Sequence, residues 1–133
     1  SVDVQEEQSY NFSEFTILIA EDEDANFVYL SELLKETSAN VIRATDGAIA
    51  VEQVRMNPSI DLILMDIKMP VMNGIEATTI IRNMRSEIPI IALTAYAMSG
   101  DKDKCLAAGC NSYISKPIFG DELLREAKLF LVK

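Results

Sequence analysis

The fold is decided by the stretch Asp61-Leu62-Ile63-Leu64-Met65-Asp66-Ile67-Lys68-Met69-Pro70, an apolar run that ends at one acidic residue. An apolar run without polar residues at alternate positions is typical of a strand that is buried on both faces. We therefore predict a strand from Leu62 to Met65, in a parallel sheet covered by helices on both sides, with Asp66 at its carboxyl end.

Four further short apolar runs predict strands, and longer amphipathic stretches separate them. The predicted strands are Thr16 to Ala20, Val41 to Ala44, Ile90 to Leu93 and Ser112 to Ser115. Apolar residues three and four apart predict the helices between and after the strands, the weakest of them around Asp101 to Ala108. The helices begin or end at typical residues: Asp46-Gly47, Pro58, Pro89 and Gly109. Strict alternation of strands and helices predicts an α/β fold, a doubly wound five-stranded parallel sheet with five helices.

Composition limits the function classes. The 133 residues, 49% of them hydrophobic, suit one folded domain, and 12 Lys and Arg against 21 Asp and Glu give a net charge of −9. That charge disfavours nucleic acid as a partner of this domain, and no apolar run approaches the roughly 20 residues that cross a bilayer. There is no His, which excludes His-based catalysis and His-ligated zinc. Cys105 and Cys110 are interpreted as reduced, packed thiols of a cytoplasmic protein.

The amino end differs from the rest of the chain. It is mostly polar and follows neither helical nor strand periodicity, so we expect residues 1–14 to be a polar linker or tail and residues 15–133 to be the folded domain. No targeting sequence is visible. A start at Ser1 suggests a processed chain or a piece of a longer one.

Polar side chains follow four of the predicted strands. The first strand is followed by Glu21 and Asp22, the third by Asp66, the fourth by Thr94 and the fifth by Lys116. In open α/β sheets, ligands bind beyond the carboxyl ends of the strands. Carboxylates gathered there repel one another unless a cation lies between them, and oxygen ligands favour Mg²⁺ or Mn²⁺. We therefore predict a site for a phosphoryl group in which Asp66 is the nucleophile and Lys116 and Thr94 contact the transferred group.

Each of these residues also has a purely structural interpretation. Asp22 or Asp24 is a candidate cap for the first helix, Thr94 a turn residue, and Lys116 a solvated loop charge. The two cysteines are explained by packing. The structural interpretation is weakest for the whole set, because every member directly follows a strand.

Four motifs contain these residues: Ile17-Leu18-Ile19-Ala20-Glu21-Asp22, Asp61 to Pro70 with Asn73-Gly74, Ile91-Ala92-Leu93-Thr94-Ala95, and Tyr113-Ile114-Ser115-Lys116-Pro117. Together they resemble the motifs of the receiver domain of two-component response regulators. The likeness spans residues 15–133. The resemblance implies a flavodoxin-like sheet of order 2-1-3-4-5. It also implies that a phosphohistidine of a histidine kinase or histidine phosphotransfer domain phosphorylates Asp66, and that the domain catalyses both this step and its own dephosphorylation.

The resemblance further assigns roles to single residues. Glu21, Asp22, Asp66 and the backbone carbonyl of Lys68 would hold Mg²⁺, with Glu21 acting largely through water. Thr94 and Tyr113 would form a switch that alters the face made by the fourth helix, fifth strand and fifth helix. Pro117 would follow a cis peptide bond, and Gly74 would adopt a backbone conformation that other residues resist.

The chain departs from the common pattern of the family at Glu21, where many receiver domains have Asp. The resemblance also implies that Lys68 and Tyr96 occupy positions that affect water access to the site. The Ala20-Glu21-Asp22 form and the segment from Thr94 to Gly109 look most like receivers of hybrid sensor kinases. That origin would make the domain the cytoplasmic part of a membrane-anchored kinase.

Two alternatives come from other classes: a Mg²⁺-dependent phosphatase, disfavoured because Asp66 follows the third strand, and a phosphorylation-independent interaction module. Tyr29 is a candidate docking residue for a His-bearing helix. The kinase, stimulus, output and oligomeric state are left open.

Overall fold

The computed structural model of the protein describes residues 9–95 and 100–132. Strands and helices alternate along the chain, as predicted. The strands are β1 (Thr16–Ala20), β2 (Asn40–Ala44), β3 (Ile60–Asp66), β4 (Ile90–Thr94) and β5 (Ser112–Ser115), and the helices are α1 (Asp24–Lys35), α2 (Gly47–Met56), α3 (Gly74–Met84), α4 (Asp101–Ala108) and α5 (Gly120–Leu131). The strands form one parallel sheet of order β2-β1-β3-β4-β5, which confirms the predicted fold class.

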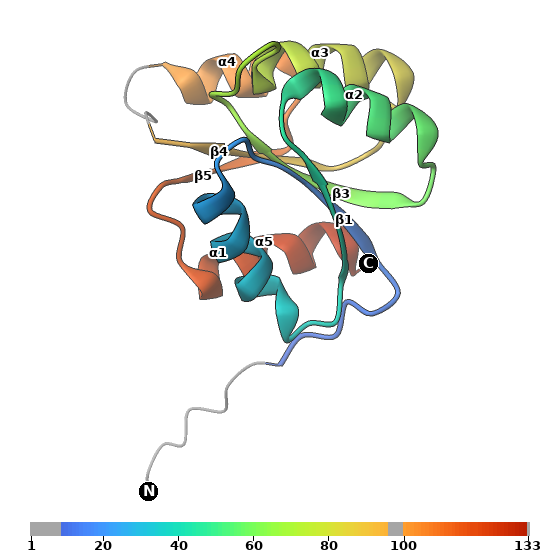
Figure 1. The fold of residues 1–133 in the computed structure, drawn as a ribbon, viewed down its shortest axis with the longest axis vertical. Helices are drawn as coiled ribbons and strands as arrows, with labels where there is room; N and C mark the ends of the chain where they lie inside the picture. Colours follow the sequence, from blue (N-terminus) through green and yellow to red (C-terminus); the bar gives the residue numbers. More distant parts are fainter. Residues whose placement is uncertain (1–8, 96–99, 133) are drawn as a thin grey trace, which may run out of the picture.

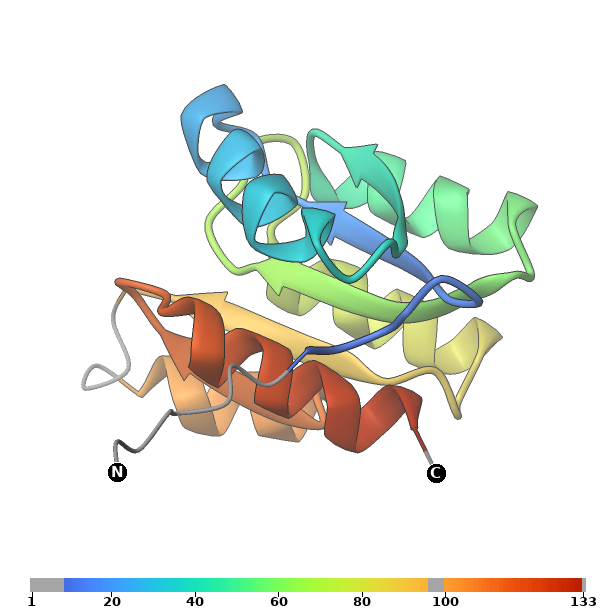
Figure 2. The same ribbon diagram turned by 90° about the horizontal axis from the view of Figure 1, so that it is seen from below.

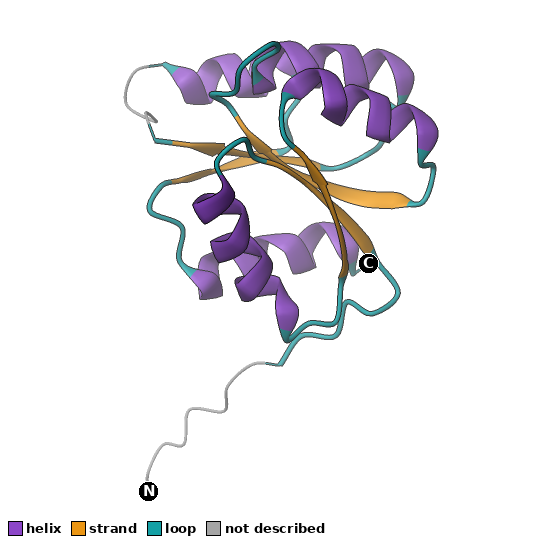
Figure 3. Cartoon of the chain, in the orientation of Figure 1, coloured by secondary structure: helices purple, strands orange, loops and turns teal. Residues whose placement is uncertain are grey.

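Helices cover both faces of the sheet (Figure 1). Helices α2, α3 and α4 lie on one face, and α1 and α5 lie on the other. The view from below shows the same layers (Figure 2), and colouring by secondary structure separates the sheet from the two helical layers (Figure 3). Both faces of the central strands are therefore removed from water, as the apolar run of β3 indicated.

Alternate residues of the strands supply two separate cores. In β3, Ile63 and Met65 pack with the apolar residues of α2 and α3, whereas Leu62 and Leu64 pack with those of α1 and α5. This division follows from the two-residue period of a strand. Because all four side chains are fully buried, β3 holds its carboxyl end, and with it Asp66, in a fixed position.

The packed part of the chain begins before Phe15. Phe12 is 1% exposed, lies in the core beneath α1 and α5, and donates its backbone N–H to the carbonyl of Thr37 at 2.7 Å. Tyr10 packs against the same core. The expectation that all of residues 1–14 form a polar tail is therefore wrong for this stretch, because one buried aromatic ring anchors it; residues 1–8 lie outside the described residues.

Helix ends agree with the sequence signals in two cases and differ in one. The Asp46 side chain accepts a hydrogen bond from the N–H of Ile49 at 2.8 Å, and Gly109 ends α4 with a φ of 118°. The capping alternative for Asp22 or Asp24 is wrong: α1 begins after Glu23, whose side chain makes no capping hydrogen bond. Asp22 is thus not explained as a cap.

The helices are also short. Among the residues that the structure describes, no helix combines the length and the apolar character needed to span a bilayer.

Candidate functional site

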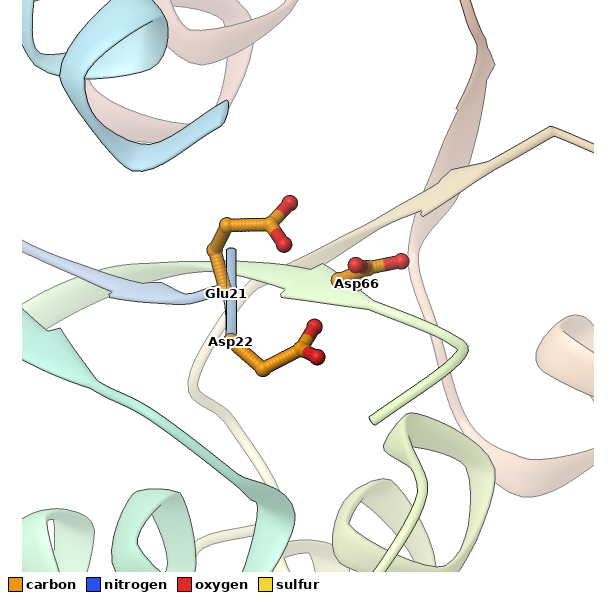
Figure 4. Close-up of side chains that lie close together, drawn as sticks. All are labelled: Glu21, Asp22 and Asp66. Atoms are coloured by element: carbon orange, nitrogen blue, oxygen red, sulfur yellow. The ribbon is translucent and has the colours of Figure 1, made fainter. Parts of the chain in front are cut away.

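Three carboxylates meet where β1 and β3 end. Glu21 and Asp22 follow β1, and Asp66 is the last residue of the neighbouring strand β3. One oxygen from each lies within 4.8 Å of the others, and the three side chains point toward a common space (Figure 4). Glu21 and Asp66 are 0% and 4% exposed, and Asp22 is half-buried.

Lys116 brings a positive charge beside these carboxylates. Its Nζ lies 3.3 Å from Oδ1 of Asp66 and 3.8 Å from Oε1 of Glu21. Its backbone N–H donates to the carbonyl of Thr94 at 2.8 Å, which fixes the residue at the end of β5. The peptide bond between Lys116 and Pro117 is cis, as the family resemblance implied.

The charge at this edge is not balanced. Burial raises the pKa of Glu21 from 4.5 to about 7, and the negative charge of Asp66 adds to the rise. The hydrogen bond from the N–H of Glu23 and the positive charge of Lys116 lower this pKa and so oppose the rise. Oε1 of Glu21 is buried without a hydrogen-bond partner. An oxygen of this kind, beside two further carboxylates, fits a hard divalent cation such as Mg²⁺ or Mn²⁺, which takes oxygen ligands.

A small cleft opens beside the carboxylates. It has a volume of about 160 Å³, and its lining includes Asp22, Asp66, Lys68, Thr94 and Lys116. The backbone N–H of Lys68 donates to Oδ1 of Asp66 at 3.3 Å, so this carboxylate is held by both Lys68 and Lys116. The cleft therefore gathers, around Asp66, the acidic, hydroxyl and ammonium groups predicted from separate strands.

The two predicted switch residues both contact the start of α4. The hydroxyl of Thr94 donates to Oδ2 of Asp101 at 3.3 Å. Tyr113 is half-buried on β5, and the Nζ of Lys102 lies 4.9 Å from the centre of its ring. Sequence reasoning named neither Asp101 nor Lys102 as part of the site, although both lie in the first turn of a predicted helix. Tyr96, which was expected to affect water access, lies outside the described residues.

The role expected for Gly74 is wrong. Its φ is not in the left-handed region; instead, a Cβ at this position would lie 2.2 Å from the carbonyl oxygen of Asp66. Glycine is required because the start of α3 passes directly against the phosphoacceptor candidate. The left-handed conformation in this loop belongs to Val71, with a φ of 67°.

Two further contacts were missed by sequence reasoning. Arg43 on β2 donates from Nε and Nη2 to the carbonyl of Glu21 at 3.2 and 3.1 Å, and pairs with Asp24 at 2.8 Å. Tyr29 donates its hydroxyl to the carbonyl of Ile118, tying α1 to the loop before α5. Neither contact has a sequence signal, because each joins residues that only the sheet order brings together.

A five-stranded parallel sheet of this order, with its polar groups gathered beyond the carboxyl ends of β1, β3, β4 and β5, defines a flavodoxin-like α/β domain with a ligand site at that edge. The family model of the response regulator receiver domain matches residues 17–128, and the chain belongs to this family of two-component signalling.

Relatives and solved structures agree with this membership. The chain is 40% identical over 110 residues to the signal transduction histidine-protein kinase BarA of Escherichia coli K12, covering 81% of this chain and 12% of BarA. It spans 4% to 16% of the full length of the first relatives that it matches, which include a hybrid signal transduction histidine kinase of Dictyostelium discoideum.

Two solved structures bear on the site. The receiver domain of the sensor histidine kinase PA1611 from Pseudomonas aeruginosa PAO1, described with a magnesium ion in its active site cleft, is 36% identical with a TM-score of 0.84, covering 90% of this chain and 98% of that one. The receiver domain of Ssk1 from Saccharomyces cerevisiae, solved with the histidine phosphotransfer protein Ypd1, is 30% identical with a TM-score of 0.83, covering 90% of each chain.

Proposed function

We propose that this receiver domain accepts a phosphoryl group on the carboxylate of Asp66 from a phosphohistidine, in a reaction that needs Mg²⁺ or Mn²⁺. The observation that carries the proposal is the position of Asp66: a buried carboxylate at the end of the central strand, 3.3 Å from Lys116 and within 4.8 Å of two further carboxylates. A carboxylate in such a setting is oriented for attack and faces groups that neutralise phosphoryl oxygens.

In this reaction an oxygen of Asp66 attacks the phosphorus atom, a P–O bond forms, and the P–N bond of the donor breaks. The imidazole leaves with the bonding electron pair and takes up a proton. Lys116 and the N–H of Lys68 hold the carboxylate in place, and Lys116 can then pair with a phosphoryl oxygen.

The bound cation would neutralise phosphoryl oxygens. Glu21, Asp22 and Asp66, with the backbone carbonyl of Lys68, are the groups that would hold it, and Oε1 of Glu21, buried without a hydrogen-bond partner, supports this assignment.

The switch proposal follows from the contacts of Thr94. Thr94 lines the cleft, and its hydroxyl donates to Asp101. Donation to a phosphoryl oxygen on Asp66 requires the hydroxyl to leave Asp101, which removes a contact between β4 and α4. Tyr113 rests under Lys102 of the same helix, so a change in α4 also changes its surroundings. Phosphorylation of Asp66 would thereby alter the surface formed by α4, β5 and α5.

We further propose a histidine kinase or histidine phosphotransfer domain as the partner, supported by the Ssk1 structure with Ypd1. We also propose an origin in a hybrid kinase. The sequence identity to much longer histidine kinases, of which this chain matches only a small part, supports it.

The test is intact-protein mass spectrometry after incubation with acetyl phosphate, with and without Mg²⁺. The chain should gain one phosphoryl group only with Mg²⁺, the Asp66→Asn variant should gain none, and the matched variant Asp103→Asn, at an exposed position on α4, should behave as the parent chain. If neither acetyl phosphate nor a phosphohistidine protein gives an adduct under rapid quench, the domain is instead a phosphorylation-independent interaction module.

A further inference from the structure

Two cysteines, Cys105 and Cys110, are joined by a backbone hydrogen bond at the C-terminal end of α4. The N–H of Cys110 donates to the carbonyl of Cys105 at 2.9 Å, and the N–H of Gly109 donates to the carbonyl of Leu106 at 3.1 Å. This pair of hydrogen bonds around a left-handed glycine is the Schellman motif, and a contact between the side chains at the two positions occupied here by Cys105 and Cys110 frequently accompanies it. We propose that these two residues form a redox-active dithiol, which a hydroperoxide converts into an intramolecular disulfide across the end of α4.

The backbone of the helix end sets how close the two cysteines lie. Both thiols are free and buried, Cys105 is 0% exposed and Cys110 is 6% exposed, and both belong to the same core cluster. The backbone motif fixes both Cβ directions, so their separation is set by hydrogen bonds that the helix end makes in any case. Short Cβ separation and fixed direction are the geometric requirements for a disulfide.

Cys110 is the thiol placed to react first. Burial raises the pKa of both thiols, and it raises the pKa of Cys105 to about 12. At Cys110, the hydrogen bond with the hydroxyl of Thr78 and the positive charge of Arg82 oppose this rise. Thr78 Oγ1 lies 3.7 Å from the Cys110 sulfur. Arg82 is held in place by the carbonyl of Gly109 at 2.8 Å, so its positive charge stays beside the thiol. A neighbouring cation is one of the features of oxidisable cysteines.

The chemistry balances with a hydroperoxide as the oxidant. The Cys110 thiolate attacks the outer peroxide oxygen, the O–O bond breaks, and after protonation an alcohol or water leaves, which gives a sulfenic acid. The Cys105 sulfur then attacks the Cys110 sulfur, an S–S bond forms, and water leaves with the thiol proton. The chain loses two hydrogen atoms, and the peroxide is reduced.

The site lies on an element that also contacts Thr94. Asp101, which accepts the hydrogen bond from Thr94, is one helical turn before Cys105 on the same face of α4, and its charge acts on the Cys105 thiol. A covalent closure at one end of α4 would thus act on the helix whose other end contacts the cleft. The proposal goes beyond phosphoryl transfer and does not require it.

The experiment compares the folded chain with the chain in urea. Both are equilibrated in glutathione redox buffers, quenched with acid, alkylated, and analysed by intact mass. The folded chain should form a monomeric disulfide, two hydrogen atoms lighter and reversible by dithiothreitol, at a glutathione disulfide level at least about tenfold lower than the unfolded chain requires, since the fold positions the two sulfurs. The folded chain treated with hydrogen peroxide should give the same product.

Two variants serve as controls. Cys105→Ser and Cys110→Ser should each remain folded by circular dichroism and should give no monomeric species that has lost two hydrogen atoms. The proposal is overturned if the folded parent chain keeps both thiols, if it gives only disulfide-linked dimers or sulfinic acid, or if the unfolded chain closes the disulfide as readily as the folded one.

Discussion

Replacing Glu21 by Gln should stabilise the domain in a way that depends on pH. In the folded chain the pKa of Glu21 is raised to about 7, chiefly by burial, from 4.5. Between these values the folded state keeps a proton that the unfolded state has released, so the stability of the parent chain falls as pH rises from about 4.5 to about 7. Gln carries no proton to lose, and its carbonyl oxygen can accept the hydrogen bond that the N–H of Glu23 now gives at 3.1 Å.

The size of the effect follows from the pKa. A tenfold change in proton affinity corresponds to about 1.4 kcal/mol, so ionising Glu21 within the fold costs up to about 3 kcal/mol. Without divalent cations, Glu21→Gln should therefore raise the free energy of unfolding by up to about 3 kcal/mol at pH 8 and by little at pH 4.5.

The assay is urea unfolding followed by circular dichroism at pH 4.5, 6, 7 and 8 in the presence of a chelator. Glu32→Gln, at an exposed position on α1, is the matched control and should change stability by less than about 0.5 kcal/mol at every pH. A stabilisation by Glu21→Gln that is equal at pH 4.5 and pH 8, or a loss of stability at pH 8, would refute the reasoning. Added Mg²⁺ should stabilise the parent chain more than the variant, because the ionised carboxylate is the better ligand.

Three further predictions concern stability and are checked by the same urea titration. Gly74→Ala should cost more than about 2 kcal/mol, because its Cβ would lie 2.2 Å from the carbonyl oxygen of Asp66; an effect under about 1 kcal/mol would contradict that close approach. Val71→Asn should raise stability by about 0.5–1 kcal/mol, because Val71 is 85% exposed and has a φ of 67°, which Asn tolerates better than a β-branched residue; a loss of stability would show that the conformation is not strained. Arg82→Ala should cost about 3 kcal/mol, because the guanidinium donates to the partly buried carbonyls of Gly109 and Ile88 at 2.8 and 2.6 Å, and both carbonyls would lose this partner; stability within about 1 kcal/mol of the parent chain would count against this role.

The fold could be predicted from local patterns because each pattern is the direct result of its environment. A strand buried on both faces has to be apolar throughout, and β3 has that composition. The strand that carries Asp66 was nevertheless predicted too short, as Leu62 to Met65, because its observed ends include the polar residues Asp61 and Asp66. The boundary near Phe15 failed for a similar reason: a single buried ring, Phe12, has no periodicity that a sequence pattern reveals.

The candidate site was predicted as a set of residues, and the structure brings that set together. Glu21, Asp22, Asp66, Thr94 and Lys116 each directly follow or end a strand, and parallel strands carry their carboxyl ends to one edge. Their chemical roles stay predictions. The contacts of Thr94 with Asp101 and of Tyr113 with Lys102 had no signal, because they depend on how α4 packs after the sheet has formed.

The sequence by itself determined which residues form strands and helices, which carboxylates and cations follow the strands, and which family the chain resembles, because these depend on residue type and short spacing. The tertiary structure alone decided that Gly74 is needed for its lack of a side chain, that Phe12 belongs to the core, and that Arg82 of α3 lies beside Cys110. The physical reason is that each of these facts is a distance between segments, and strand order and helix packing set such distances after the local elements have formed.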